Sequence, residues 1–386
     1  MKIAFVIPAY LPAISFGGPV SILRNIVEIL KKRGHDITIY TTNAINSKRF
    51  MSQPRQEYIE GVLIKRYNIL FKVAGYWVAP SMFQDLMNDD FDLIHAHCAR
   101  SFQLDLAALV SRLRGKPLVV TAHGAIGNYK MMELKVRILY RLHNAILKIS
   151  LNQAKKLIAL NNAEIEQYKS RGISEEKIEV IPNGIDLSEY DNLPSKGSFR
   201  KKFFIKNNEK IILYVGRIHK EKGLDLLIKA INIVFKKLDR VKLVIVGPDD
   251  GYASYLSELL YKLEIADKVI FTGFINKDDK MAAFLDSDVF VTPNFRGFPI
   301  TFLEAMFTGT PIITTIKGDN LKWIHRNVGI VTEYCVVKLA NALLEILQDR
   351  ELKEKYENNC KLYIKKFDIA NITSILERVY NKILTD

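Results

Sequence analysis

The most restrictive feature of the sequence is an apolar run that leads through a glycine loop into a short helical run. Residues 289–292 form the apolar run, Gly297 and Pro299 lie in the loop, and the helical run stops at Gly309. A loop between a strand and a helix leaves backbone N–H groups free at the helix start, where an anion is stabilised. The stretch therefore predicts a strand-loop-helix unit with a phosphate-binding loop.

The same order of elements recurs in both halves of the chain. Residues 2–7 and 210–215 are apolar runs that also lead through glycine-containing loops into helical patterns. Strands that alternate with helices are typical of parallel sheets with helices on both faces. A chain of 386 residues exceeds what one hydrophobic core normally serves. We therefore expect two such domains, joined by the polar stretch 188–208.

Glu304 lies near the middle of the short helical run, among residues that are otherwise apolar. A carboxylate there must meet a ligand, a donor group or solvent, and a sugar hydroxyl is one candidate. The surrounding run resembles the E-x7-E signature of the retaining nucleotide-sugar glycosyltransferases of family 4, written EGFGxxxLEAMAxGxPV. The matching residues are Phe298, Leu303, Glu304, Ala305, Met306, Gly309 and Pro311. The resemblance implies that Glu304 binds the ribose hydroxyls of a nucleotide.

The chain departs from this signature at its first glutamate, which usually touches the donor sugar and is Arg296 here. One hypothesis is that Arg296 pairs with an acidic donor sugar, because arginine forms bidentate contacts with such groups. The alternative is that its side chain points away, and that backbone N–H groups of Phe298 and Ile300 hold the sugar. The resemblance places Gly297 in the same donor-binding loop. Pro299 stands where the family usually has glycine, which removes one backbone donor.

A second stretch places two cations after a strand. The run 210–215 ends at Gly216, and Arg217 and Lys222 follow. Two cations near a helix start can neutralise a diphosphate as it leaves, although as surface charges they would be unremarkable. The Gly-Arg-x4-Lys-Gly order is similar to the G-R-L-x3-K-G segment of family 4. That similarity implies catalytic roles for both cations and a donor-binding role for Gly216.

Two further stretches bear on the nucleotide and on metals. Gly273 and Phe274 follow the run 269–272, and in similar proteins this loop borders the nucleotide base. Asp286 and Asp288 look like the D-x-D of metal-dependent glycosyltransferases, but they match the A-D-V-F-V strand entry of family 4. We interpret them as structural. We expect no metal and no other cofactor, with the nucleotide sugar as co-substrate.

The first half carries functional candidates where its predicted strands end. In a parallel sheet, ligands gather at the carboxyl ends of strands. We interpret His95 and His97, at the end of the run 92–97, as structural, because a metal site would need further ligands. His123 ends the next run, and its Thr-x-His-Gly pattern resembles that of the family residue that contacts the donor sugar. We therefore assign His123 a catalytic role.

Gly17 and Gly18 follow the first strand run. In family 4 this loop faces the donor phosphates and the acceptor, whereas as structure alone it is a tight connection. We keep both interpretations.

Residues 127–150 form a helical pattern that mixes apolar residues with five basic and one acidic side chain. Such a stretch can lie on an anionic bilayer, and the alternative is a core-facing helix with a solvated basic face. The net charge of +14 favours polyanionic partners, but no nucleic-acid motif is present. No apolar stretch is long enough for a membrane span. We expect a cytoplasmic protein with peripheral contact to the inner face of the cytoplasmic membrane.

The resemblance covers essentially the whole chain and implies the GT-B architecture, two doubly wound Rossmann-like domains that face an interdomain cleft. We expect an acceptor-side domain over 1–187, the linker 188–208, a nucleotide-sugar-binding domain over 209–366, and a last helix over 367–386 that packs on the first domain. The expected function is retaining transfer from a UDP- or GDP-sugar to a hydroxyl of a glycan or lipid-linked acceptor. A GT-B epimerase, a phosphorylase and a non-catalytic nucleotide-sugar-binding protein are the alternatives.

Overall fold

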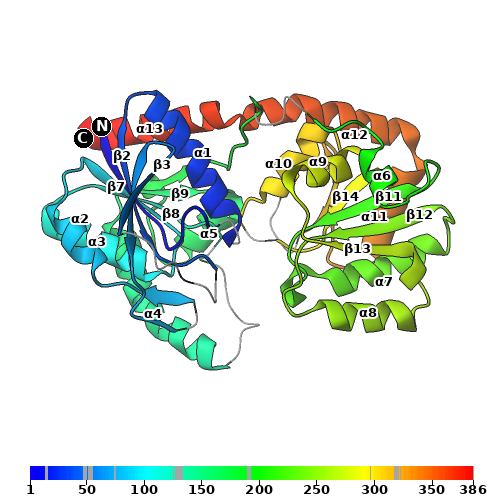
Figure 1. Cartoon of the computed structure of the whole chain (residues 1–386), viewed down its shortest axis with the longest axis horizontal. Helices are drawn as coiled ribbons and strands as arrows, with labels where there is room; N and C mark the ends of the chain where they lie inside the picture. The colour runs from blue at the N-terminus through cyan, green and yellow to red at the C-terminus, as the bar shows by residue number, and fades with distance from the viewer. Residues whose placement is uncertain are drawn as a thin grey trace. The chain divides into compact units, whose positions relative to one another are not determined.

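The computed structural model divides the chain into two compact units (Figure 1). The first unit comprises residues 1–184 and 369–386, and the second comprises residues 185–368. The structure describes the chain apart from residues 14–15, 47–49, 51–54, 74, 125, 127–133, 189–192, 296, 317–320, 322 and 386, and the side chains of 134–137.

The first unit is built on an eight-stranded sheet with the order β10-β9-β8-β7-β1-β2-β4-β3. Its strands are β1 (Lys2–Val6), β2 (Asp36–Thr42), β3 (Gln56–Ile59), β4 (Val62–Tyr67), β7 (Leu93–His97), β8 (Leu118–Thr121), β9 (Lys156–Ala159) and β10 (Ile178–Val180). Neighbouring strands are parallel, except that β3 is antiparallel to β4. All residues of β7 and β8 are buried, and apart from His95, His97 and Thr121 they are apolar, as is typical of strands covered on both faces.

Helices and one small hairpin complete the first unit. The helices are α1 (Gly18–Lys32), α2 (Met82–Asn88), α3 (Phe102–Arg114), α4 (Leu134–Gln153), α5 (Asn162–Lys169) and α13 (Ile369–Thr385), and the hairpin is β5 (Phe71–Val73) with β6 (Tyr76–Val78). Although α13 is the last helix of the chain, it packs against α1. Glu377 on α13 pairs with Arg33 at 2.7 Å and with His35 at 2.6 Å.

The second unit contains a six-stranded parallel sheet with the order β13-β12-β11-β14-β15-β16. Its strands are β11 (Lys210–Val215), β12 (Val241–Val246), β13 (Val269–Gly273), β14 (Val289–Thr292), β15 (Ile312–Thr315) and β16 (Gly329–Thr332). Its α-helices are α6 (Ser198–Lys202), α7 (Leu224–Phe235), α8 (Ala253–Lys262), α9 (Lys277–Leu285), α10 (Ile300–Thr308), α11 (Val336–Gln348) and α12 (Arg350–Tyr363). Residues 198–202 of the stretch expected as a linker thus form a helix, and its Phe199 is buried in this unit.

Asp286 and Asp288 hold elements of the second unit together. Asp286 accepts hydrogen bonds from the backbone N–H groups of Gly197 at 2.5 Å and Arg200 at 3.0 Å. Asp288 accepts one from the N–H of Ile211 at 2.8 Å and pairs with Lys353. Both carboxylates therefore stabilise the fold.

Each sheet changes winding direction at one strand. In the first unit β1 lies between β2 and β7, and in the second β11 lies between β12 and β14. Crossovers on the two sides of such a strand leave in opposite directions, which opens a crevice at the carboxyl ends of the strands. The prediction of two doubly wound α/β domains is confirmed, and these two switch points are where ligand-binding residues are expected.

We predict that Gly247→Ala destabilises the second unit by about 2 to 4 kcal/mol. Gly247 follows β12 with a φ of 138°, and a Cβ there would lie 2.1 Å from the carbonyl oxygen of Gly216. Urea-induced unfolding measures the loss. Gly251→Ala is the matched control, because Gly251 also has a positive φ but no atom within 4 Å of its Cβ position. Equal losses for the two variants would contradict the role of this close approach.

Candidate functional site

The switch point of the second unit brings two sequence signatures together. Asn294, just after β14, donates a hydrogen bond from Nδ2 to the carbonyl oxygen of Glu221 at 2.6 Å. Gly223 adopts a left-handed φ of 73°, and a Cβ there would lie 3.1 Å from Cβ of Pro293. The loop that carries Arg217 and Lys222 therefore packs against the loop that leads into α10.

Of the two predicted cations, Arg217 is exposed and Lys222 is partly buried. Arg217 follows Gly216 at the end of β11, and its half-exposed guanidinium pairs with the carboxylate of Asp250. Lys222 closes a 3-10 turn over Lys220–Lys222, directly before α7. An exposed ion pair such as the one between Arg217 and Asp250 is weak. The guanidinium can therefore exchange its partner for an anionic ligand at little cost.

Glu304 is buried within α10, with 3% of its surface exposed. Its Oε1 accepts a hydrogen bond from Nζ of Lys280 on α9 at 2.6 Å. Its Oε2 is buried and has no hydrogen-bond partner among the described residues. A buried carboxylate oxygen without a donor is costly, so a ligand hydroxyl that reaches it gains a charge-assisted hydrogen bond.

In the described part of the loop before α10, the chain turns at Gly297 and enters the helix at Pro299. Gly297 has a left-handed φ of 65°, and Pro299 caps α10 without a side-chain hydrogen bond. Phe298 is 6% exposed, and its ring stacks on that of Trp323 with a centroid distance of 5.5 Å. The Phe298 side chain is therefore part of the core. Arg296 lies outside the described residues.

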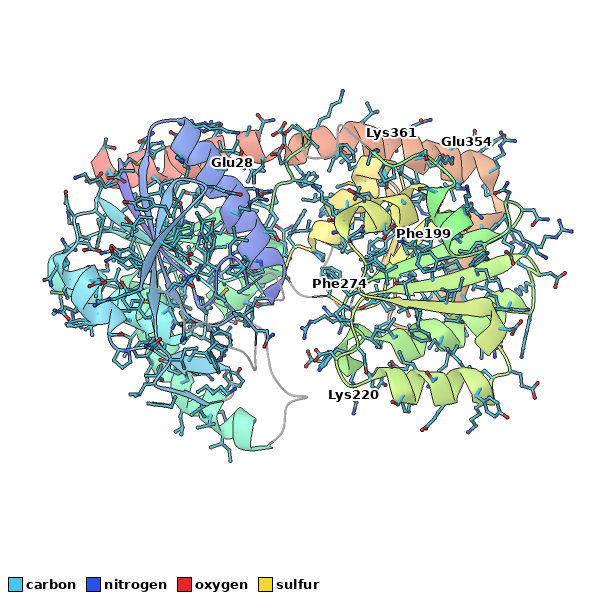
Figure 2. The ribbon with its side chains drawn as sticks, viewed as in Figure 1. Glu28, Phe199, Lys220, Phe274, Glu354 and Lys361 are labelled. Atoms are coloured by element: carbon cyan, nitrogen blue, oxygen red, sulfur yellow. The ribbon has the colours of Figure 1, made fainter. Side chains whose placement is uncertain are left out.

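The loop after β13 presents an aromatic surface. Phe274 is 73% exposed, and Figure 2 labels its side chain. The neighbouring Gly273 has a positive φ of 68°, and its carbonyl oxygen accepts a hydrogen bond from the N–H of Gly247 at 2.9 Å. An exposed ring beside a nucleotide site can stack on a base.

In the first unit, Gly17 and Gly18 begin α1 beside an open cavity. Gly17 has a φ of 75° and caps the helix without a side-chain hydrogen bond, and Gly18 is its first residue. The cavity measures about 620 Å³, and among the described residues that line it Lys72 is the one with a charged side chain. The other residues that line it are Ile7, Pro8, Ala9, Phe16, Pro19, Val20, Gly75, Trp77 and Cys98. Its position at the ends of β1 and β7 is the switch point of this sheet.

Three histidines form a row at the ends of β7 and β8. His97 Nδ1 lies 2.8 Å from His123 Nε2, and the ring centroids of His95 and His97 are 4.2 Å apart. His95 contacts the hydroxyls of Tyr380 at 2.5 Å and Thr121 at 2.8 Å. Burial lowers the pKa of His95 to about 3 and that of His123 to about 4, and it lowers the pKa of His97 as well. All three rings are therefore neutral near pH 7.

The loop that follows β8 is held in an unusual conformation. His123 has a positive φ of 52°, a region that non-glycine residues rarely occupy. The buried carboxylate of Glu164 fixes the chain after it by accepting hydrogen bonds from the N–H groups of Gly124 and Leu160. Backbone strain of this kind is concentrated at functional sites.

Comparison with known proteins identifies the family. Residues 16–189 match the family model described as Glycosyltransferase Family 4, and residues 195–363 match the one described as Glycosyl transferases group 1. The chain belongs to the family 4 glycosyltransferases. Its predicted membership and its glycosyltransferase activity are thereby confirmed.

Similar proteins extend over the full length of this glycosyltransferase. An uncharacterised glycosyltransferase of Methanocaldococcus jannaschii is 29% identical, with 98% of each chain covered. The alpha-monoglucosyldiacylglycerol synthase of Streptococcus pneumoniae is 26% identical, with 99% of this chain and 88% of the synthase covered. The structure of Anabaena HepE in complex with UDP matches with a TM-score of 0.79 and 21% identity, over 99% of this chain and 100% of HepE. This likeness confirms the predicted GT-B fold.

Some contacts of the glycosyltransferase were not predicted from the sequence. Lys280 carries no motif signal, because it is one of several charged residues at the start of α9. His97 was interpreted as structural, yet it contacts the ring of His123. The strand register offered a clue, since His97 pairs with Thr121, two residues before His123. Tyr380 could not be predicted, because it is distant in sequence.

We predict that the buried histidines make the protein less stable in acid. Their pKa values are lower in the folded state than the usual 6.5, so the unfolded chain takes up protons that the folded chain excludes. Their neutral-state contribution is complete above pH 6.5 and falls by roughly 1 kcal/mol per pH unit for each histidine between about pH 6 and 4. Urea titrations across this range measure the slope. His95→Gln should have a shallower slope, and an unchanged slope would contradict the assignment.

Proposed function

We propose that this glycosyltransferase moves a sugar, with retention of anomeric configuration, from a UDP- or GDP-sugar to a hydroxyl of a glycan or lipid-linked acceptor. The observation that carries the proposal is the buried Glu304 carboxylate, whose Oε2 has no hydrogen-bond partner among the described residues. Two relatives support it by name: HepE binds UDP, and the Streptococcus pneumoniae enzyme makes a glycolipid.

The nucleotide would bind at the carboxyl edge of the second sheet. Glu304 would accept hydrogen bonds from the ribose hydroxyls, and Phe274 would stack on the base next to Gly273. Gly216 would let the backbone come close to the diphosphate, and a side chain is excluded at this position because its Cβ would lie 2.8 Å from the Tyr214 hydroxyl. These contacts orient the donor before any bond changes.

The donor sugar would lie near the start of α10. The left-handed Gly297 turns the chain, and the backbone N–H groups of Phe298 and Ile300 would hold the sugar. The rival hypothesis pairs Arg296 with an acidic sugar. An Arg296→Glu variant separates the two, because only a pairing arginine would change the preference between neutral and acidic donors.

Charge stabilisation would supply most of the catalysis. As the bond between the anomeric carbon and the phosphate oxygen breaks, negative charge grows on the leaving diphosphate, and Arg217 and Lys222 would stabilise it. The departing phosphate oxygen would take the proton of the acceptor hydroxyl, which attacks from the same face. His123 would orient the sugar from the first unit, and no metal would be required.

The acceptor would bind to the first unit, at the loop of Gly17 and Gly18. The described residues that line the cavity beside this loop are mainly apolar, Trp77 among them, and they include Lys72. Such a surface suits an acceptor with an apolar part and an anionic group.

The surface of α4 provides the argument for membrane contact. Ile138, Leu142, Ile146 and Ile149 recur at helical spacing and are each about half exposed or more, and Arg141 and Lys148 are also exposed. No helix within the described part of the chain has the length and apolarity to cross a bilayer. We therefore extend the proposal to peripheral binding of an anionic bilayer at the inner face of the cytoplasmic membrane.

We predict nucleotide release from one class of donor in a panel of UDP-, GDP- and ADP-sugars, neutral and acidic. Release should be insensitive to EDTA, because Arg217 and Lys222 take the place of a metal. If no donor in the panel releases its nucleotide and calorimetry detects no donor binding, the proposal is contradicted.

Glu304→Gln should weaken binding of the active donor by about 10- to 100-fold, the value of a hydrogen bond to a charged group. The affinity for the 2′-deoxy analogue of this donor should fall much less when Glu304 is replaced, because the analogue already lacks the 2′-hydroxyl that Glu304 would bind. Glu258→Gln, an exposed change of the same kind on α8, should have no effect. Equal losses for the two nucleotides would contradict the ribose contact.

Flotation with vesicles that contain anionic phospholipid tests the membrane proposal. Leu142→Asp should reduce the bound fraction by about tenfold, since it removes one large apolar side chain and adds a negative charge. Tyr261→Asp, which changes an exposed side chain on α8 of the second unit, should bind like the wild type. Equal vesicle binding by the wild type and Leu142→Asp, or equal binding to anionic and neutral vesicles, would overturn the membrane proposal.

A further inference from the structure

The contact between His97 and His123 also restricts which of their ring nitrogens carry a proton. The rings stack with an interplanar angle of 24°, and a single hydrogen bond of 2.8 Å joins Nδ1 of His97 to Nε2 of His123. His97 is 1% exposed, whereas His123 is only partly buried. Nε2 of His123 is thus occupied, and Nδ1 is the ring nitrogen left to meet a ligand.

The other nitrogen of His97 restricts how protons are distributed. His97 Nε2 is buried and has no hydrogen-bond partner among the described residues. A cavity of about 20 Å³ lies beside the three histidines and is otherwise lined mostly by apolar side chains, among them Ile22, Ile158 and Leu376. A cavity of this size has room for about one water, but its mostly apolar walls offer few of the two to four polar partners that a buried water needs.

A neutral imidazole carries its proton on one nitrogen, and a buried N–H without an acceptor is rarer than an unpaired acceptor. The lower-cost arrangement leaves His97 Nε2 bare and places the proton on Nδ1. His97 then donates to His123 Nε2. His123 must in turn carry its own proton on Nδ1.

We infer that His97 is a positioning residue that holds His123 as its Nδ1–H tautomer, so that the exposed side of the ring donates a hydrogen bond to an oxygen of the donor sugar. The inference rests on the proposed function for the identity of that oxygen. His97 touches no substrate itself and acts through His123.

The surroundings of His97 hold its ring in place. His95 packs against it on one side and is fixed by Thr121 and by Tyr380 of α13, and Phe5 contacts both rings, with centroids 5.5 Å from His95 and 5.8 Å from His97. None of these neighbours carries a charge near neutral pH. The proton on the His97–His123 bond is therefore placed by hydrogen bonding alone.

Nitrogen-15 NMR of the full chain, labelled at histidine and assigned with a His123→Asn variant, reads the tautomer directly. The expected spectrum has a protonated Nδ1 and a bare, hydrogen-bonded Nε2 for His123. A protonated Nε2 on His123 in the wild type would overturn the inference. This result does not depend on turnover, so it is distinguishable from a failure of the proposed function in the donor panel.

Two variants test the effect on transfer. His97→Leu removes the donor and should lower kcat by about tenfold or more, with donor KM changed less than about threefold, because the missing contact orients rather than binds. His97→Asn places an amide near the Nδ1 position and should restore most of kcat and the Nδ1–H signal of His123. His35→Asn is the matched control in the same unit.

An unchanged kcat in His97→Leu would overturn the inference. So would a failure of His97→Asn to restore the His123 signal while the variant keeps a wild-type unfolding midpoint. If His97→Leu does not fold, the wild-type spectrum and His97→Asn still decide.

Discussion

The reversal of strand order at β1 and at β11 is the constraint on which the two units depend. Parallel strands cannot be joined by tight turns, so most connections cross one face of the sheet with a helix. Where the crossovers change direction, the carboxyl ends of neighbouring strands are left uncovered. Arg217 and Asn294 follow the two strands at this point in the second unit, and Pro8 and Cys98 do so in the first. The strand order of each sheet therefore places the crevice at these carboxyl ends, whichever side chains line it.

The switch points of the two units carry different kinds of side chain. The side chains at the switch point of the second unit are charged. Two cations lie in the loop whose backbone accepts a hydrogen bond from Asn294, and the buried Glu304 carboxylate pairs with Lys280 through Oε1. The first unit has mainly neutral groups at its switch point: three histidines whose pKa values burial lowers, and a largely apolar cavity with Lys72 in its lining. Under the proposed function, the cations would stabilise the diphosphate, and the neutral donors and apolar walls would hold the sugar and the acceptor.

Sequence reasoning predicted the elements well, because buried parallel strands read as continuous apolar runs and glycines mark the turns that follow them. Glu304 could be selected because a carboxylate in an apolar helical run is conspicuous. The pairing of Glu304 with Lys280 could not be predicted, because the spacing of residues along the sequence does not show which positions of α9 and α10 face each other. The contact of His97 with His123 depends on the register between β7 and β8, which the sequence does not state. Arg296, the main departure from the family signature, lies outside the described residues, so its role stays a prediction.

The most direct test of the central claim is the stereochemistry of transfer. With the active donor and an acceptor that it glycosylates, proton NMR of the product reports the configuration at the new anomeric centre. The account predicts that an α-configured donor gives an α-linked product, because the leaving diphosphate, stabilised by Arg217 and Lys222, accepts the proton on the face of attack. A β-linked product would contradict it, since inversion requires a general base on the opposite face of the sugar.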